Sequence, residues 1–184
     1  MLAMRRPGES LDVLGPLGGT FEPITSGRSA VMVAGGVGVA PFIFLAHESL
    51  RTGQAAPEDI TVLFGAATAG LLSGEEKFRD MGVSVSLATD DGSTGHHGFV
   101  PALLEDILQN DPDRCDYIYA CGPTPMMKGS QTIARDSGRP GQVSLEGIMP
   151  CGVGVCMACV VPCRQPGSSE GATRYERVCY TGPV

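Results

Sequence analysis

Residues 29–46, with the sequence SAVMVAGGVGVAPFIFLA, decide the fold of this chain, because they carry no charged side chain over 18 positions. An uncharged run of that length raises the question of a membrane-spanning helix. Three glycines and Pro41 interrupt the run and argue against one continuous helix. The run instead indicates a buried parallel strand, a glycine-rich turn and the first turns of a helix, which is typical of a sheet covered on both faces.

The rest of the chain repeats this alternation of strand and helix. Short apolar runs predict five strands, at residues 30–34, 60–64, 83–88, 116–120 and 142–145. Between the third and fourth strands, one apolar stripe recurs with helical spacing at Val100, Leu103, Leu104, Ile107 and Leu108. Helix starts are expected at Pro41, Ser73, Pro101 and Pro123. The alternation predicts a doubly wound, five-stranded parallel sheet, with ligands outside the carboxyl ends of its strands.

Two turns at those carboxyl ends are candidates for nucleotide binding. The first follows the first strand and contains Gly35, Gly36, Val37, Gly38, Ala40 and Pro41. Its backbone N–H groups and the helix that it opens can hold a pyrophosphate, although Pro41 stands where the G-x-G-x-x-G pattern has its third glycine. The second turn follows the fourth strand and contains Cys121, Gly122, Pro123 and Met126. A glycine-rich turn alone is often only a tight turn, but two on one sheet edge predict a nucleotide site.

Five of the seven cysteines lie in the last 34 residues. Cys151, Cys156 and Cys159 have the spacing C-x4-C-x2-C, and Cys179 follows at a distance, which is the plant-type ligand pattern of a [2Fe-2S] cluster. A zinc site is the alternative reading of a C-x2-C pair, but it needs a second compact pair, and no histidine follows His97. Disulfides suit small secreted domains better than a chain of 184 residues.

A fifth cysteine, Cys163, is close enough in sequence to compete as a ligand. Its simpler interpretation is a free thiol on a strand that leaves the cluster loop, because the plant-type pattern places the fourth ligand far along the chain. The stretch 165–173 that follows is rich in glycine and serine and is expected to be a loop.

Composition narrows the functional classes. The chain is 42% hydrophobic with 26 glycines and 14 prolines, which indicates one globular core rich in loops and a small appended module. The net charge is -7 without a block of Lys or Arg, so no nucleic-acid surface is expected. The start of the chain has no charged-then-apolar signal segment. Together with the cysteine pattern, this predicts a soluble protein of the reducing cytoplasm, with no membrane partner.

The segments GGVGVAP, ATDDGS, ACGPTPMM, SLEGIMPCGVGVCMAC and YERVCYTGPV together resemble the ferredoxin–NADP reductase superfamily. Within it, residues 11–184 are similar to the electron-transfer subunits of NAD-dependent dihydroorotate dehydrogenases. This resemblance implies an FAD-binding barrel, then a nicotinamide-nucleotide domain, then a [2Fe-2S] module. It also implies a heterotetramer with an FMN-containing dihydroorotate dehydrogenase catalytic subunit, in which electrons pass between that FMN and NAD by way of the cluster and FAD, in pyrimidine biosynthesis.

The resemblance also assigns residues. It implies Cys151, Cys156, Cys159 and Cys179 as the cluster ligands, and it requires no catalytic acid or base. Related flavoprotein subunits of sulfide dehydrogenases and transhydrogenases tend to have Asp where Cys151 stands, so this cysteine favours the dihydroorotate family. A redox sensor that binds nucleotide without turnover is the alternative from another functional class.

The resemblance divides the chain at residues 1–27, 28–146 and 147–184, as a barrel remnant with its hinge, a nucleotide domain and a cluster module. Only residues 8–21 resemble the closing strand of the flavin barrel, and the Arg-x-Tyr-Ser type motif does not occur. Either the sequence is a fragment or another chain supplies the flavin site. The chain alone is therefore expected to retain little FAD, with about its first twenty residues disordered, swapped or docked on a neighbour.

The loop after the third strand predicts NAD rather than NADP. Thr89, Asp90 and Asp91 occupy this loop, and residues 82–100 contain no Lys or Arg. A carboxylate commonly binds the free ribose diol, whereas a 2'-phosphate needs a basic partner. A plain Asp-Gly turn is the structural alternative for either aspartate. The nearby His96 and His97 are expected to be solvated in a polar loop.

Overall fold

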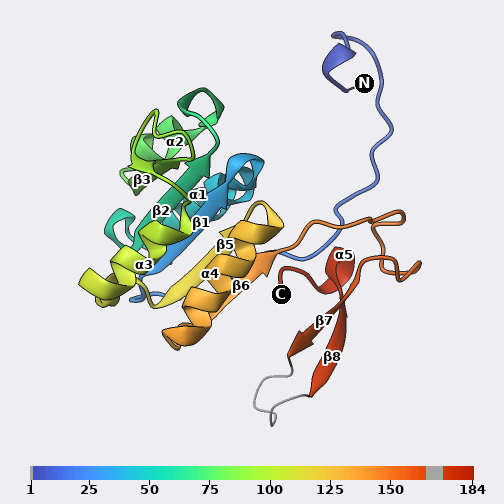
Figure 1. Ribbon diagram of the computed structural model, residues 1–184. Coiled ribbons are helices and arrows are strands. Elements are labelled where there is room, and N and C mark those ends of the chain that lie inside the picture. Colours follow the sequence, from blue (N-terminus) through green and yellow to red (C-terminus); the bar gives the residue numbers. More distant parts are fainter. Residues whose placement is uncertain (1, 165–171) are drawn as a thin grey trace.

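The computed structural model describes residues 2–164 and 172–184, and most of them form a parallel sheet with helices on both faces (Figure 1). The strands are β1 (Ala30–Gly35), β2 (Ile60–Ala66), β3 (Ser84–Thr89), β4 (His96–His97), β5 (Tyr117–Cys121) and β6 (Gly141–Ser144). Their spatial order is β4-β3-β2-β1-β5-β6, and every neighbouring pair is parallel. The predicted doubly wound α/β class is confirmed.

The sheet has six strands rather than the predicted five, because His96 and His97 form a short edge strand instead of a loop. They pair with Ala88 and Thr89 of β3. Both imidazoles are exposed, as predicted. A strand of two polar residues has neither the length nor the alternation that marks a strand in a sequence, so only backbone pairing to β3 reveals it.

The helices divide between the two faces. On one face lie α1 (Ala40–Arg51) and α2 (Glu75–Asp80), and on the other lie α3 (Pro101–Asn110) and α4 (Thr124–Asp136). The predicted starts hold within two residues, with Pro101 as the first residue of α3 and Pro41 as the second of α1. Short 3-10 turns complete the connections, at η1 (Leu2–Met4), η2 (Gly36–Val39), η3 (Pro57–Asp59), η4 (Ala69–Leu71) and η5 (Pro112–Arg114).

The core is two apolar layers separated by the sheet. Successive side chains of a strand point to opposite faces, so Met32 and Ala34 pack with Phe42 on the side of α1, whereas Val31 and Val33 pack with the helices of the other side. All of these side chains are fully buried. This two-sided burial explains why residues 30–35, the strand part of the 29–46 run, contain no charge.

The crevice expected to bind ligand lies between β1 and β5. These strands are neighbours, yet the chain after β1 winds toward β4 and the chain after β5 winds toward β6. Such a topological switch point opens a crevice at the carboxyl ends of the strands. It therefore brings the two predicted nucleotide turns side by side.

The cluster module lies beside the sheet. It contains a loop at residues 145–159, an antiparallel hairpin of β7 (Val160–Arg164) and β8 (Thr173–Arg177), and the short helix α5 (Val178–Thr181). Figure 1 shows the hairpin standing clear of the sheet. Cys163 is on β7, as predicted. Of the loop expected at 165–173, residues 165–171 lie outside the described part of the chain.

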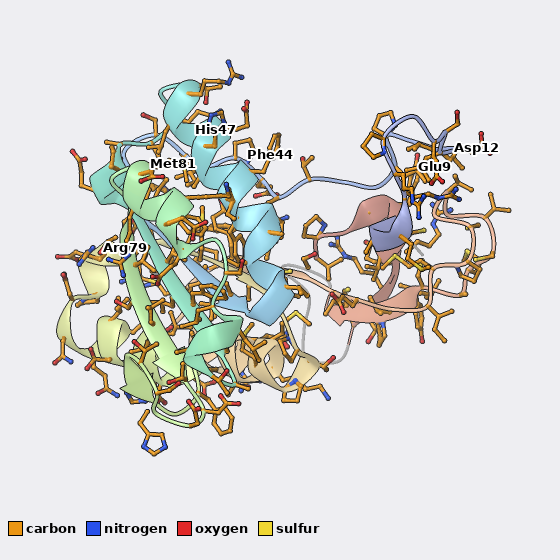
Figure 2. The ribbon with its side chains drawn as sticks, turned by 90° about the horizontal axis from the view of Figure 1, so that it is seen from above. Glu9, Asp12, Phe44, His47, Arg79 and Met81 are labelled. Carbon is orange, nitrogen blue, oxygen red and sulfur yellow. The ribbon has the colours of Figure 1, made fainter. Side chains whose placement is uncertain are left out.

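The segment that precedes β1 runs between the sheet and the cluster module. Phe21 and Ile24 are buried in the α1 face of the core, whereas Val13 and Leu14 are exposed. Figure 2 shows Glu9 and Asp12 away from the sheet, on the same side as the cluster module. The predicted docking or exchange of this segment with a neighbour stays a prediction. Among the described helices, none has the length and apolar character needed to span a membrane.

Candidate functional site

The two nucleotide turns touch through glycine backbones. A Cβ added to Gly122 would lie 2.9 Å from the Gly35 Cα, and one added to Gly35 would lie 2.7 Å from the Met126 Sδ and from the Pro123 Cδ. A Cβ on Gly38 would overlap the Cys121 carbonyl oxygen. Real side chains do not approach so closely, so glycine is required at each position. The structure thus brings the predicted turns into direct contact.

The first turn coils before its helix begins. Residues Gly36–Val39 form the 3-10 turn η2, and α1 starts only at Ala40. Val37 is 82% exposed at the tip of the turn, whereas Gly38 is buried against the second turn. A phosphate group would meet an exposed backbone edge at the start of a twelve-residue helix.

The second turn presents a neutral, enclosed thiol. Cys121 is 6% exposed, and burial raises its pKa above the ordinary value, while hydrogen bonding to Ser144 lowers it. Met126 is half-buried and packs on the core together with the buried Met127. Both methionines therefore have a structural role, and Met126 also borders Gly35.

The three candidate residues in the loop after β3 have different surroundings. Thr89 is fully buried, and its Oγ1 donates a 2.7 Å hydrogen bond to the Thr94 carbonyl. Asp91 accepts hydrogen bonds from the backbone N–H and the hydroxyl of Ser93, at 3.0 and 2.6 Å, which lower its pKa. Asp90 is exposed. The turn interpretation therefore applies to Asp91, whereas the carboxylate of Asp90 faces solvent.

The cluster loop surrounds Cys151 with backbone donors. Its pKa falls to about 6, first because the Cys156 N–H donates to its sulfur and then because the Val153 N–H does. Gly152 and Gly154 have φ values of +66° and +77° in this loop, and such left-handed backbone favours glycine. The loop therefore stabilises a thiolate at Cys151, which is the form that binds metal.

A second pair of thiols lies beside the first. The Cys179 N–H donates to the Cys159 Sγ at 3.5 Å, and this bond, followed by one from the Cys179 thiol, lowers the pKa of Cys159. The pKa of Cys179 is raised, first because its thiol donates to Cys159. Both cysteines are buried, and the charge of Cys151 acts on each.

The four cysteines of the cluster module lie as two pairs. Among the described residues, no three His, Cys, Asp or Glu side chains converge on a single metal position. The thiols instead form two pairs, Cys151 with Cys156 and Cys159 with Cys179. Each iron of a [2Fe-2S] cluster takes two thiolates in addition to the bridging sulfides, so the donor set fits such a cluster.

Cys163 lies apart from these pairs. It is opposite Arg174 on the hairpin, and its pKa is raised by burial and then by Glu176. Its electrostatic neighbours are thus two charged hairpin residues and not another thiol.

Contacts from β8 and α5 hold the cluster loop in place. The Arg177 Nη1 donates a 2.9 Å hydrogen bond to the Gly154 carbonyl, and its guanidinium lies 4.9 Å from the centre of the Tyr180 ring. The Val178 N–H donates to the Cys159 carbonyl at 3.2 Å. These contacts join Cys179 to the loop that carries the other three predicted ligands.

A cavity of about 540 Å³ lies between Pro41, at the end of the first nucleotide turn, and the cluster module. Pro41 and Phe44 of α1 form one wall, Leu17 and Gly18 form another, and Cys179 borders it from the cluster module. Figure 2 shows Phe44 on α1, and its ring is 67% exposed. Phe44 was not predicted as a site residue, although its position one turn after Pro41 in an uncharged run was an available signal. The cavity contacts both predicted sites.

Two family models match the chain. The oxidoreductase NAD-binding domain matches residues 32–132, and the iron-sulfur cluster binding domain of dihydroorotate dehydrogenase B matches residues 146–184. The chain therefore carries an NAD-binding domain and an iron–sulfur cluster-binding domain.

Curated relatives match over the whole chain. The dihydroorotate dehydrogenase B (NAD+) electron transfer subunits of Geobacillus sp. strain WCH70 and Bacillus caldolyticus are 39% and 40% identical over 186 aligned positions, which cover 100% of this chain and 66% of each relative. That of Caldanaerobacter subterraneus is 34% identical and is covered to 67%. The chain thus spans about two thirds of the length of these relatives.

A solved structure agrees with this relationship. The chain is similar to an NADH-dependent reduced ferredoxin–NADP oxidoreductase with a TM-score of 0.79 and 32% identity, covering 99% of this chain and 60% of the other. The C-terminal domain of a Pyrococcus furiosus hydrogenase shares the fold, with a TM-score of 0.54 and 16% identity over 71% of this chain and 100% of the other. With its NAD-binding and iron–sulfur domains in the same order, the chain belongs to the family of dihydroorotate dehydrogenase B electron transfer subunits.

Proposed function

We propose that this chain carries electrons between NAD and the FMN of a dihydroorotate dehydrogenase catalytic subunit, through FAD and a [2Fe-2S] cluster. The observation that carries the proposal is the cavity bordered by Pro41 of the first nucleotide turn and by Cys179 of the cluster module. A flavin ring in this cavity would lie between the two redox sites. Bound there, a flavin exchanges two electrons with a nicotinamide and single electrons with an iron–sulfur cluster.

The residues of the chain would bind, orient and shield these groups. Phe44 and Leu17 offer an apolar surface to a planar ring. Cys151, Cys156, Cys159 and Cys179 would hold the two irons in pairs, and backbone N–H groups of the loop would stabilise the charge on sulfur. None of these steps needs a catalytic acid or base.

The nucleotide would bind at the crevice between β1 and β5. Its pyrophosphate would meet the turn at residues 35–41, and its nicotinamide end would lie against Cys121 and Gly122. Exposed Asp90 supports NAD as the nucleotide, because a carboxylate there would accept from a ribose diol and repel a 2'-phosphate. The proposed domain boundaries lie at residues 27/28 and 146/147. A reducing compartment is proposed, because it would keep the cysteines as free thiols.

The partner subunit would dock on the cluster loop. Val155 and Met157, which flank the exposed Cys156 in sequence, are 77% and 58% exposed, and Ile148 of the same loop is 80% exposed. An apolar rim around a redox centre suits a protein interface better than bulk water. Docking there would bring the FMN subunit next to the cluster ligands and would leave the cavity on the other side free for flavin.

The test is reconstitution with the FMN-containing catalytic subunit. The two chains are coexpressed with the flavin-binding segment of a relative, and dihydroorotate-dependent reduction of NAD is followed by absorbance at 340 nm. We expect turnover that is lost in Cys156→Ser and retained in Cys163→Ser. A complex that contains flavin and cluster but shows equal turnover in both variants would contradict the electron path.

A second candidate function follows from the 32% identity to the reduced ferredoxin–NADP oxidoreductase over 99% of the chain. A transhydrogenase or sulfide dehydrogenase subunit would share the nucleotide turns and the cluster module. Cys151 favours the dihydroorotate reading, and the copurifying partner decides between them. A redox sensor is the third candidate. It would bind NADH and change the oxidation state of its cluster without catalytic turnover.

A further inference from the structure

We infer that residues 182–184 form a backbone latch that positions the cluster module on the nucleotide domain, with Gly19 and Val143 as its positioning residues. The inference rests on the proposed function, because it assigns the latch the task of fixing the last cluster ligand beside the flavin cavity.

The first half of the latch is a two-bond pairing with the sheet edge. The Val143 N–H donates to the Val184 carbonyl at 2.6 Å, and the Val184 N–H donates to the Val143 carbonyl at 3.0 Å. Val143 belongs to β6, the last strand on its side of the sheet. Because both of its backbone groups point to Val184, they are not used in the ladder to β5. The cluster module is thus joined to the free edge of the sheet.

The second half is a close approach to the segment before β1. A Cβ on Gly19 would overlap the Gly182 carbonyl oxygen and lie 3.3 Å from the Gly182 carbonyl carbon. A Cβ on Gly182 would lie 2.5 Å from the Val178 carbonyl oxygen, to which the Gly182 N–H donates at 3.1 Å. Residues 182–184 therefore fit in this position only because Gly19 and Gly182 have no side chains.

Both walls of the latch are fixed by the nucleotide domain, because Val143 belongs to it and the segment of Gly19 is packed on it. The segment of Gly19 is held by the Glu22 N–H, which donates to the Gln142 Oε1 at 2.7 Å, and by the Tyr119 hydroxyl, which donates to the Glu22 carbonyl at 2.9 Å. The Phe21 ring packs 5.4 Å from that of Phe42. Because the Gly19 segment and Val143 are both fixed, they also fix the position of residues 182–184 between them.

The latch is close to the chemistry. Cys179 is three residues before Gly182, in the short helix α5. Gly19, Gly182 and Cys179 all line the same cavity. A displaced latch would move Cys179 relative to the flavin cavity without removing any cluster ligand. Electron transfer depends on that separation, so Gly19 and Val143 would affect rate rather than iron binding.

Four variants test the latch in the complex reconstituted with the catalytic subunit and the flavin-binding segment of a relative. Gly19→Ala inserts a methyl group against Gly182, and Val143→Pro removes the N–H that donates to Val184, a change that an edge strand can accommodate. Gly147→Ala is the control for the first, because a Cβ there meets nothing within 4 Å. Val143→Ala is the control for the second, because it shortens the side chain and keeps the N–H.

We expect amide hydrogen exchange in the peptide covering residues 178–184 to rise roughly tenfold in Gly19→Ala and Val143→Pro, as the loss of one or two hydrogen bonds predicts. Iron per chain should stay at the wild-type value, and the EPR spectrum of the reduced cluster should shift. The rate of cluster reduction by NADH should fall several-fold, whereas reduction by dithionite should be unchanged. Both controls should match the wild type.

Unchanged exchange in both latch variants, or equal exchange in variants and controls, would overturn the latch. Increased exchange with an unaltered EPR spectrum and rate would leave residues 182–184 as a structural contact and would overturn the positioning role. These results are distinct from failure of the proposed function, which would appear as wild-type protein without a reducible cluster. The exchange measurement is valid in either case, because it requires no iron.

Discussion

At the scale of single residues, the four paired cysteines distinguish themselves from Cys163 by their neighbours. Cys159 and Cys179 hydrogen-bond to each other, and Cys151 receives backbone donors from its own loop. Cys163 faces Arg174 and Glu176 instead. The spacing in the sequence suggested this division, and the structure adds that the four predicted ligands are grouped in twos.

We predict that Cys→Ser substitution at 151, 156, 159 or 179 abolishes the [2Fe-2S] EPR signal and lowers iron per chain at least severalfold, because each thiolate is one of only four cluster ligands. Cys163→Ser should retain both the signal and the iron. Iron quantitation and EPR of the reduced protein provide the measurement. Retention of the cluster in Cys179→Ser with loss in Cys163→Ser would reverse the assignment.

The loop after β3 gives a prediction about nucleotide choice. Asp90→Ser should reduce the preference for NADH over NADPH about tenfold, since a repelling carboxylate is removed, as measured by titration of each nucleotide. Asp91→Ser is the matched comparison, and it should mainly loosen the turn, because Asp91 accepts hydrogen bonds from Ser93. Tighter binding of NADPH than NADH by the wild-type chain would refute the preference.

At the scale of elements, the strands and helices of the sheet were predictable because burial on both faces leaves long uncharged runs. The 30–34 prediction, for instance, became Ala30–Gly35. The strand His96–His97 was not predictable, because backbone pairing alone creates it. The hairpin of β7 and β8 also escaped prediction as a pair, since Pro162 and Cys163 interrupt the alternation on one strand and charged residues dominate the other.

The starts of β1 and β5 are joined by one carboxylate. Asp116 Oδ2 accepts from the Ser29 N–H at 3.0 Å and from the Ser29 hydroxyl at 3.2 Å, and Arg139 lies 3.5 Å from its other oxygen. The pKa of Asp116 is lowered, first by the Ser29 N–H. A lowered folded pKa means that this carboxylate stabilises the fold at pH above about 4, its ordinary value, and that the contribution is lost as pH falls through the folded pKa.

We therefore predict that Asp116→Asn lowers the free energy of unfolding by about 1 kcal/mol at neutral pH, a value reduced for its partial exposure. The difference from wild type should shrink as the pH falls below about 4. Thermal unfolding followed by circular dichroism at several pH values is the measurement. Asp113→Asn is the control, because Asp113 contributes its backbone carbonyl to Ser29. A difference that grows on acidification would contradict the assignment.

At the scale of the whole molecule, the cavity and the latch could not be predicted, because each joins segments remote in the sequence. Gly19 and Gly182 are separated by most of the chain, and no motif links them. Their contact exists only once the segment before β1 has docked through Phe21. The candidate nucleotide turns were predictable for the opposite reason, since each is a local strand-to-helix connection at a known edge of the sheet.

The cavity gives a prediction about flavin. We expect this chain alone to retain less than a tenth of an equivalent of FAD after gel filtration. The cavity offers only a wall for the flavin ring, and the flavin motif of the Arg-x-Tyr-Ser type does not occur in these 184 residues. NADH should then not reduce the cluster until a flavin carrier is added. Absorbance of the purified chain and anaerobic stopped-flow mixing are the measurements. Stoichiometric FAD with rapid unaided reduction would place the flavin site on residues assigned here to other roles.

The exposed rim of the cluster loop has a consequence for handling the protein in air. Cys156 is open to solvent, with Val155 and Met157 on either side. If Cys156 holds iron as proposed, dioxygen would reach that iron–sulfur bond without any opening of the fold. Bleaching of the visible absorbance under air should be fast for the isolated chain and slow once a partner covers this rim. The catalytic subunit would then act as the shield that keeps the cluster intact, in addition to being its electron partner.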